Sequence, residues 1–123
     1  LIRAFGMKER ADGGQMLVYY SLGNFVSTQE AIPELLEGMA KFTLKKDLDT
    51  GKVTVSDYSM QPLVMHYDTG KTNCAVYKLS DYTEELAKAH GIHKYSELES
   101  IQEFFAPFLT PQTFASGSQK NSD

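Results

Sequence analysis

The clearest structural signal in the chain is the stretch GMAKFTLKKDLDTGKVTVSDY, residues 38–58. Apolar and polar side chains alternate in its first half, as they do in a strand with one buried and one solvated face. This alternation turns Ala40, Phe42 and Leu44 toward a core and leaves the lysines between and after them in water. The first half of the stretch therefore predicts a half-buried strand.

A tight turn and a returning strand complete a hairpin. The residues Asp49-Thr50-Gly51-Lys52 are typical of a hairpin turn in which Gly51 takes a positive φ angle. The run from Lys52 to Tyr58 is rich in β-branched residues and is predicted to return beside the first strand.

Shorter apolar and aromatic runs, separated by turn residues, lie on both sides of this hairpin. Pro62 interrupts the extended pattern, which predicts a separate strand or edge segment beyond it. Residues 28–37 are polar and predict a loop, with one helical turn after Pro33. The further strands are expected at 16–22, 63–67 and 73–79, with turns at 11–14 and 68–71.

The spacing of apolar residues becomes helical after residue 80. Asp81 with Glu84 is typical of a helix start, and Gly91 is typical of a helix end. Ser96 with Glu99 repeats the start signal. Apolar residues follow it at helical spacing, and a proline near the end stops or kinks this second helix: Leu98, Ile101, Phe105, Pro107 and Phe108.

The chain is thus predicted to be α+β, with four to five mostly antiparallel strands and two short C-terminal helices. Its 123 residues, 41% hydrophobic and 23% charged, suit one ordinary globular domain. That domain is expected over residues 1–114, with strands at about 16–79 and helices at about 81–109. Residues 115–123 form a polar tail.

Charge and cysteine content exclude several classes of partner and site. The net charge is −4 and no basic cluster occurs, so no nucleic-acid partner is expected. No apolar run reaches the roughly 18 residues of a membrane helix, so no direct membrane span is expected. Cys74 is the single cysteine, which rules out an internal disulfide and a cysteine zinc site; we expect it to be a small buried hydrophobe.

Residues 20–26 read YSLGNFV, and this run closely resembles the signature strand and turn of CapA-type proteins, the poly-γ-glutamate capsule-biosynthesis family. The flanking sequence agrees: an apolar strand precedes the run, Ser27 and Gln29 follow it, and Gly38 opens the next strand. The likeness covers about the first half of the chain, and the two helices match only loosely. Because the chain opens on Leu1 without an initiator Met, it is interpreted as the C-terminal portion of such a protein.

The resemblance implies the sandwich of a calcineurin-like metallophosphoesterase, in a protein at the bacterial cell envelope. In that family an aspartate with a histidine, a glycine-asparagine-histidine and a glycine-histidine-x-histidine motif bind two divalent metals. These motifs belong upstream, and none occurs in this sequence. The parent protein could then be a metal-dependent hydrolase, whereas this chain alone is expected to be inactive, with no cofactor, metal or catalytic residue of its own.

Ser21, Gly23, Asn24 and Gln29 are the candidate substrate-binding residues, because the family's site lies at the edge where this run ends. The alternative interpretation is structural: Gly23 makes a tight turn, and Asn24 bridges loops by hydrogen bonds.

The three histidines give weak support for a metal site. His90 and His93 are three residues apart, but Gly91 between them should end the helix that would align them. His66 and Asp68 occupy alternate strand positions and therefore share a face. A structural role is favoured for all four residues.

The expected partners are the remainder of the parent chain, a second copy of this chain and an anionic envelope polymer. Isolated sheet edges favour a homo-oligomer. Lys41, Lys45 and Lys46 could attract the polymer, although outward lysines on a strand usually form a solvated face. The rival interpretation is a stand-alone envelope binding or protein-interaction module without catalysis.

Overall fold

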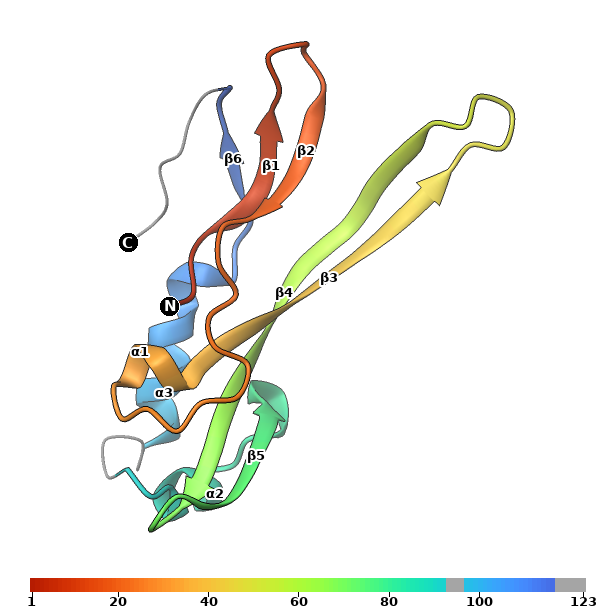
Figure 1. Cartoon of the computed structure of the whole chain (residues 1–123). Coiled ribbons are helices and arrows are strands. Elements are labelled where there is room, and N and C mark those ends of the chain that lie inside the picture. The colour runs from red at the N-terminus through yellow and green to blue at the C-terminus, as the bar shows by residue number, and fades with distance from the viewer. Residues whose placement is uncertain (93–96, 117–123) are drawn as a thin grey trace.

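The computed structural model describes residues 1–92 and 97–116 of the chain. Within them the backbone forms six strands and three α-helices, and the strands make two three-stranded sheets (Figure 1). This confirms the predicted α+β class. The strands are β1 (Phe5–Glu9), β2 (Gln15–Tyr19), β3 (Leu36–Lys46), β4 (Val53–Asp68), β5 (Thr72–Lys78) and β6 (Gln112–Phe114). The helices are α1 (Ile32–Leu35), α2 (Glu84–Ala89) and α3 (Leu98–Phe105), with 3₁₀ turns at Leu79–Asp81 and Ala106–Phe108.

The first sheet has the order β2-β1-β6 and joins both ends of the described chain. β1 and β2 form an antiparallel hairpin, and β6 pairs with β1 in parallel. The predicted strands omitted β1 and β6. Gly6 weakens the strand signal of β1, and its missing side chain is what lets the Gln112 backbone approach. The three residues of β6 are too few for a sequence pattern.

The second sheet has the order β3-β4-β5 and is antiparallel throughout. β3 and β4 form the predicted hairpin, with Gly51 at a φ of +74° in its turn. The predicted interruption at Pro62 is wrong, because β4 continues over 16 residues. Pro62 lies opposite Gly38, one residue before the β5 ladder begins at Leu63. β4 has a neighbouring strand on one side only at that point, and a sheet edge tolerates proline.

The segment after β2 ties the two sheets together. Leu22 makes an antiparallel bridge to Ile2, and its carbonyl accepts the Gly38 N–H at 2.8 Å. Gly38 permits this approach, since a Cβ there would lie 2.6 Å from Met60 Sδ and 3.3 Å from Ile2 Cδ1. The chain between the sheets is therefore held on both sides.

The apolar core lies between the second sheet, the start of β1 and α3. Ile101 and Phe105 are buried, as their helical spacing predicts. The buried members of this core are Ile2, Phe5, Leu35, Leu36, Met60, Val64, Met65, Tyr67, Tyr82, Ala87, Ile101 and Phe105. No helix in residues 1–92 or 97–116 is long and apolar enough to cross a bilayer.

The two predicted C-terminal helices are matched in part. α2 begins after Thr83, whose Oγ1 accepts the Leu86 N–H at 3.1 Å, so Thr83 rather than Asp81 caps it. Asp81 instead ends a preceding 3₁₀ turn. α3 begins after Glu97, and the cap predicted at Ser96 lies outside the described residues. The helical turn predicted after Pro33 is confirmed as α1.

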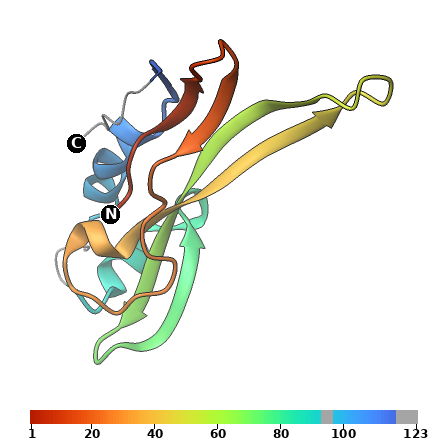
Figure 2. The same cartoon turned by 45° about the horizontal axis from the view of Figure 1, so that its top comes forward.

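The far half of the β3–β4 hairpin, residues 42–57, projects from the body as a two-stranded arm (Figures 1 and 2). The prediction that Phe42 and Leu44 face a core is wrong, because they are 48% and 60% exposed. The alternation is present, but β3 and β4 extend beyond the elements that cover the inner part of the sheet. Cys74 on β5 is likewise exposed rather than buried.

Tyr19 joins the end of β2 to the base of the arm. Its ring stacks on Phe5 with a centroid separation of 5.0 Å. Its hydroxyl lies 2.6 Å from the Ser59 carbonyl oxygen and 3.3 Å from that of Lys41. The hydroxyl thus bonds backbone acceptors of the other sheet.

We expect Tyr19→Phe to lower the free energy of unfolding by about 1 kcal/mol, because it removes this hydrogen bond and keeps the stacked ring. Urea denaturation measures the change. Tyr58→Phe is the matched control, since the Tyr58 hydroxyl has no hydrogen bond to a described residue. Equal losses in the two variants would contradict this role of Tyr19.

Candidate functional site

The run at residues 20–26 turns sharply at Gly23. Gly23 has a φ of +79°, and its N–H donates to Ser21 Oγ at 3.3 Å. A Cβ at Gly23 would lie 3.3 Å from both Cα and Cβ of Glu37, so the turn rests on the start of β3. The Ser21 carbonyl accepts the Arg3 N–H at 2.9 Å. These contacts of Ser21 and Gly23 support the backbone of the turn.

The other two candidate residues lie on the surface. Asn24 follows the turn and is exposed, and so is Gln29 farther along the loop. The Gln29 carbonyl accepts the Tyr67 hydroxyl at 3.0 Å. With its amide oriented to donate, the Gln29 side chain meets the Glu34 carboxylate at 2.6 Å. Gln29 therefore anchors the loop, and Asn24 is the candidate whose side chain is most open to a ligand.

Beneath the turn, Glu37 is a buried carboxyl group. It is 1% exposed, and neither of its carboxyl oxygens has a hydrogen-bond partner among the described residues. Burial raises the pKa of Glu37 from 4.5 to about 8. Sequence reasoning missed this residue, because a glutamate in a strand is normally solvated and only the Gly23 turn shows that this one is covered.

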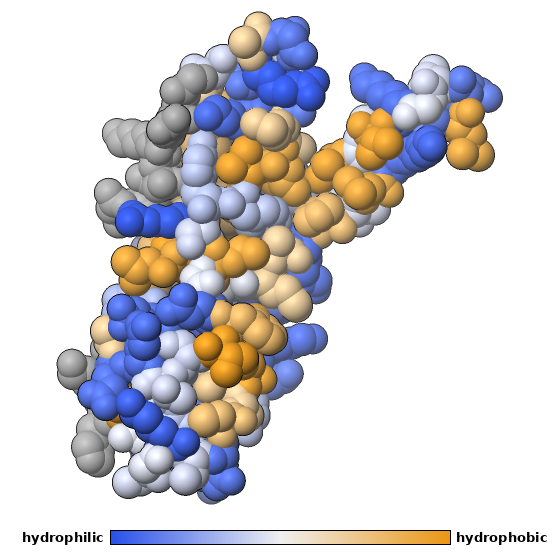
Figure 3. Space-filling model, in the orientation of Figure 1, coloured by the Kyte–Doolittle hydropathy of each residue, from blue (hydrophilic) through white to orange (hydrophobic). Residues whose placement is uncertain are grey.

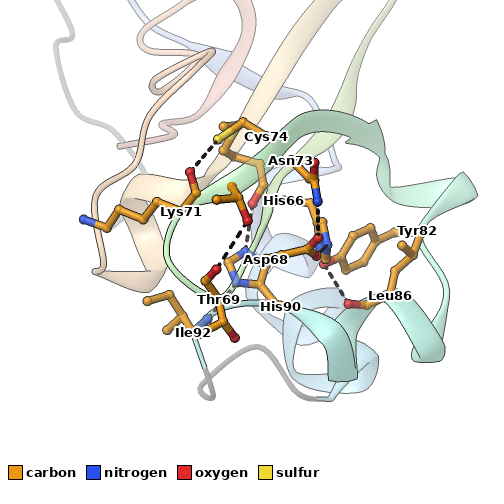
Figure 4. A network of polar contacts seen from close by, with 12 residues as sticks. His66, Asp68, Thr69, Lys71, Asn73, Cys74, Tyr82, Leu86, His90 and Ile92 are labelled. Atoms are coloured by element: carbon orange, nitrogen blue, oxygen red, sulfur yellow. Dashed lines mark hydrogen bonds and ion pairs between the residues drawn. The ribbon is translucent and has the colours of Figure 1, made fainter.

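A polar network surrounds His66 on β4 (Figure 4). His66 Nδ1 lies 2.6 Å from Tyr82 Oη, and His66 Nε2 lies 3.3 Å from Asp68 Oδ1. Asn73 Nδ2 donates to the other oxygen of Asp68 at 2.8 Å. His66 makes both of its contacts when its Nε2–H donates to Asp68 and its Nδ1 accepts from Tyr82.

Strand geometry assembles this network. His66 and Asp68 are alternate residues and share a face, as predicted. The β4–β5 register shifts between them, which leaves an extra residue on β5. Asn73 lies in that irregularity with a φ of +54°, which asparagine tolerates better than most residues. The irregular pairing brings its amide to Asp68, and no sequence signal marked Asn73 or Tyr82 as a partner.

His90 is held at the end of α2 by backbone groups. Its Nε2 lies 3.0 Å from the Met65 carbonyl oxygen, and its Nδ1 lies 3.0 Å from the Ile92 nitrogen. The carbonyl can only accept and the N–H can only donate, so these partners assign the neutral tautomer with hydrogen on Nε2. Desolvation by burial lowers the pKa of His90, and the nearby His66 adds to this effect.

The electrostatics of the network favour a structural role. The hydrogen bond from Asn73 lowers the pKa of the Asp68 carboxyl, with a further contribution from His66. Burial raises the pKa of the Tyr82 phenol, which therefore stays protonated at neutral pH. The His66 side chain is only 5% exposed and that of Asp68 is 44% exposed. Both ring nitrogens of His66 are engaged, so it presents no free nitrogen to a substrate.

The same contacts bear on the metal hypothesis. The lone pair on Nδ1 of His90 already accepts the Ile92 N–H. His93 lies outside the described residues. Residues 1–92 and 97–116 contain no group of three or more His, Cys, Asp or Glu side chains placed to hold a metal ion.

Comparison of the chain with protein-family models, curated proteins and solved structures found no match.

We expect Glu37 to make the protein less stable as pH rises. The folded state keeps a proton that the unfolded chain releases between pH 4.5 and about 8. The free energy of unfolding therefore falls across that window by up to roughly 1.4 kcal/mol per pH unit. Urea denaturation at pH 6.5 and pH 8, above the range in which His90 contributes, measures it. Glu37→Gln should remove this slope, whereas Glu9→Gln, at an exposed position, should keep it; an unchanged slope in Glu37→Gln would contradict the assignment.

Because His90 is buried in its neutral form, we expect the protein to lose stability at acid pH. Its depressed folded pKa means that the unfolded chain takes up a proton first, so stability is lost as pH falls below about 6.5. Long-range ¹⁵N NMR should find His90 neutral, with hydrogen on Nε2, at pH 6. A cationic His90 at that pH would refute the tautomer. His90→Gln keeps a donor toward Met65 and should reduce the acid sensitivity.

Proposed function

We propose that this chain is the C-terminal structural and site-supporting portion of a CapA-type capsule-biosynthesis protein at the cell envelope. The parent would have a metallophosphoesterase-like sandwich and would carry its divalent metals on upstream motifs. One observation carries the proposal: the family-like run at residues 20–26 forms the joint between the two sheets, through Leu22 and Gly38.

Beyond the joint, the run presents a surface for further contacts. Phe25 and Val26 are each 65% exposed, next to the exposed Asn24. Apolar side chains beside a free amide suit contact with the remainder of the parent chain and with its substrate. In this proposal Ser21 and Gly23 hold the turn, and Asn24 reaches the substrate.

Exposed residues of the β3–β4 hairpin are suited to contact with two further partners. Lys41, Lys45 and Lys46 are exposed along β3 and could bind an anionic envelope polymer. The exposed apolar residues of the arm favour a homo-oligomer. These same features support the alternative function, a stand-alone envelope binding or protein-interaction module without catalysis.

The coding sequence upstream of Leu1 separates the two functions. We expect it to encode glycine-asparagine-histidine and glycine-histidine-x-histidine motifs. An export signal directly before Leu1 would contradict the main proposal and favour the interaction module.

In the whole protein, Gly23→Ala should lower capsule-polymer yield several-fold, because it strains the joint. Gly70→Ala is the matched control. Both glycines have a φ near +80°, at +79° and +80°, but a Cβ at Gly70 would meet no atom within 4 Å. Polymer yield and protein level are measured together. Equal losses in the two variants would show that the joint has no special role.

A further inference from the structure

Two strand edges face each other across a cleft. β2 is an outer strand of its sheet, and β4 pairs with β5 only from Leu63 onward. The part of β4 from Val53 to Gln61 therefore has no strand neighbour on that side among the described residues. In both ribbon views this edge of β4 faces β2 (Figures 1 and 2). Tyr19 closes the narrow end of the cleft through its hydrogen bond to the Ser59 carbonyl.

The cleft has a volume of about 690 Å³ and a mixed lining from both hairpins, in which Arg10, Gln15 and Lys52 accompany apolar side chains. The body contributes Met7, Leu17 and Tyr19, and the arm contributes Phe42, Val53 and Val55. Apolar side chains lie along the arm and on the adjacent body in the space-filling view (Figure 3). Leu44 and Val55 lie directly opposite each other across the β3–β4 ladder, so they share one face of the arm.

The free edge of β3 and the free edge of the N-terminal half of β4 differ in charge. β3 carries Lys41, Lys45 and Lys46, and edge lysines are a common protection against strand pairing. Residues 53–56 of β4 are Val-Thr-Val-Ser, with no charge and a strong preference for strands. β4 therefore presents the edge that is open to another strand.

We propose that a second copy of this chain occupies this edge, with the β4 strands of two copies pairing antiparallel about a twofold axis at Val55. The inference rests on the self-association proposed above and gives its location. The pairing sets Val55 opposite Val55 and Thr54 opposite Ser56 of the second copy, in the regular part of β4 that precedes the bulge at Asp57. No charged residues oppose each other within residues 54–56 of the two copies.

The alternative edge brings like charges together in the register centred on Thr43. The same pairing of two β3 strands about Thr43 would set Lys41 opposite Lys45 twice, which is repulsive. Pairing through β4 is symmetric and closes on itself, so it gives a dimer and not a filament. It also forms a four-stranded ribbon whose apolar face combines the valines, Phe42 and Leu44 of both copies.

Sedimentation equilibrium of the chain over a range of concentrations tests self-association. We expect a dimer, and we expect Val55→Lys to raise its dissociation constant at least tenfold, because two lysines would meet at the axis. Thr43→Lys is the matched control on β3 and should leave the constant unchanged. Far-UV circular dichroism checks that both variants fold.

Hydrogen exchange locates the contact independently of any variant. Amides within residues 53–58 should gain protection as concentration rises, whereas those within 39–46 should not. If Val55→Lys leaves the dissociation constant of the dimer unchanged and the amides of 53–58 gain no protection, the contact does not lie at the β4 edge, although the chain still self-associates. A wild-type monomer at all concentrations would overturn both. Neither result bears on the family proposal, which the upstream coding sequence tests.

Discussion

The close approach of the two sheets at Gly38 is the constraint on which the rest of the structure depends. The Gly38 N–H bonds the Leu22 carbonyl, and the missing side chain leaves room for Met60 and Ile2. The Gly23 turn lies against the neighbouring Glu37. β1 and β2 have five residues each, whereas β4 has 16, so the far part of the hairpin leaves the body.

That mismatch in length gives β4 two environments. Its C-terminal half lies between β3 and β5 and contributes Val64, Met65 and Tyr67 to the core. Its N-terminal half has one strand neighbour and an apolar face that looks into a cleft. A two-stranded ribbon has little stability in water by itself, and this one exposes Phe42, Leu44 and Val53.

The buried ionisable groups are part of the packing of the fold. Glu37 and His90 are both buried in their neutral forms, and they limit stability from opposite sides of the pH scale. Tyr82, His66 and Asp68 form a connected chain of hydrogen bonds, yet its central ring has no free nitrogen. Such a network fixes how the β4–β5 hairpin meets α2. The residues that are open to a ligand lie elsewhere, at the turn after β2 and along the arm.

The sequence alone determined the local features: the β3–β4 hairpin with its Gly51 turn, the α+β class, the helical spacing of Ile101 and Phe105, and the shared face of His66 and Asp68. Each depends on residues close in the chain, whose periodicity records the local conformation. Only the tertiary structure decided which residues of these strands and helices are buried. Phe42 and Leu44 alternate with polar residues as buried residues do, but they lie beyond the elements that cover the sheet, and Glu37 is buried although glutamate is normally solvated. The pairing of β1 with β6 likewise left no local pattern, because burial and long-range pairing depend on contacts between segments far apart in sequence.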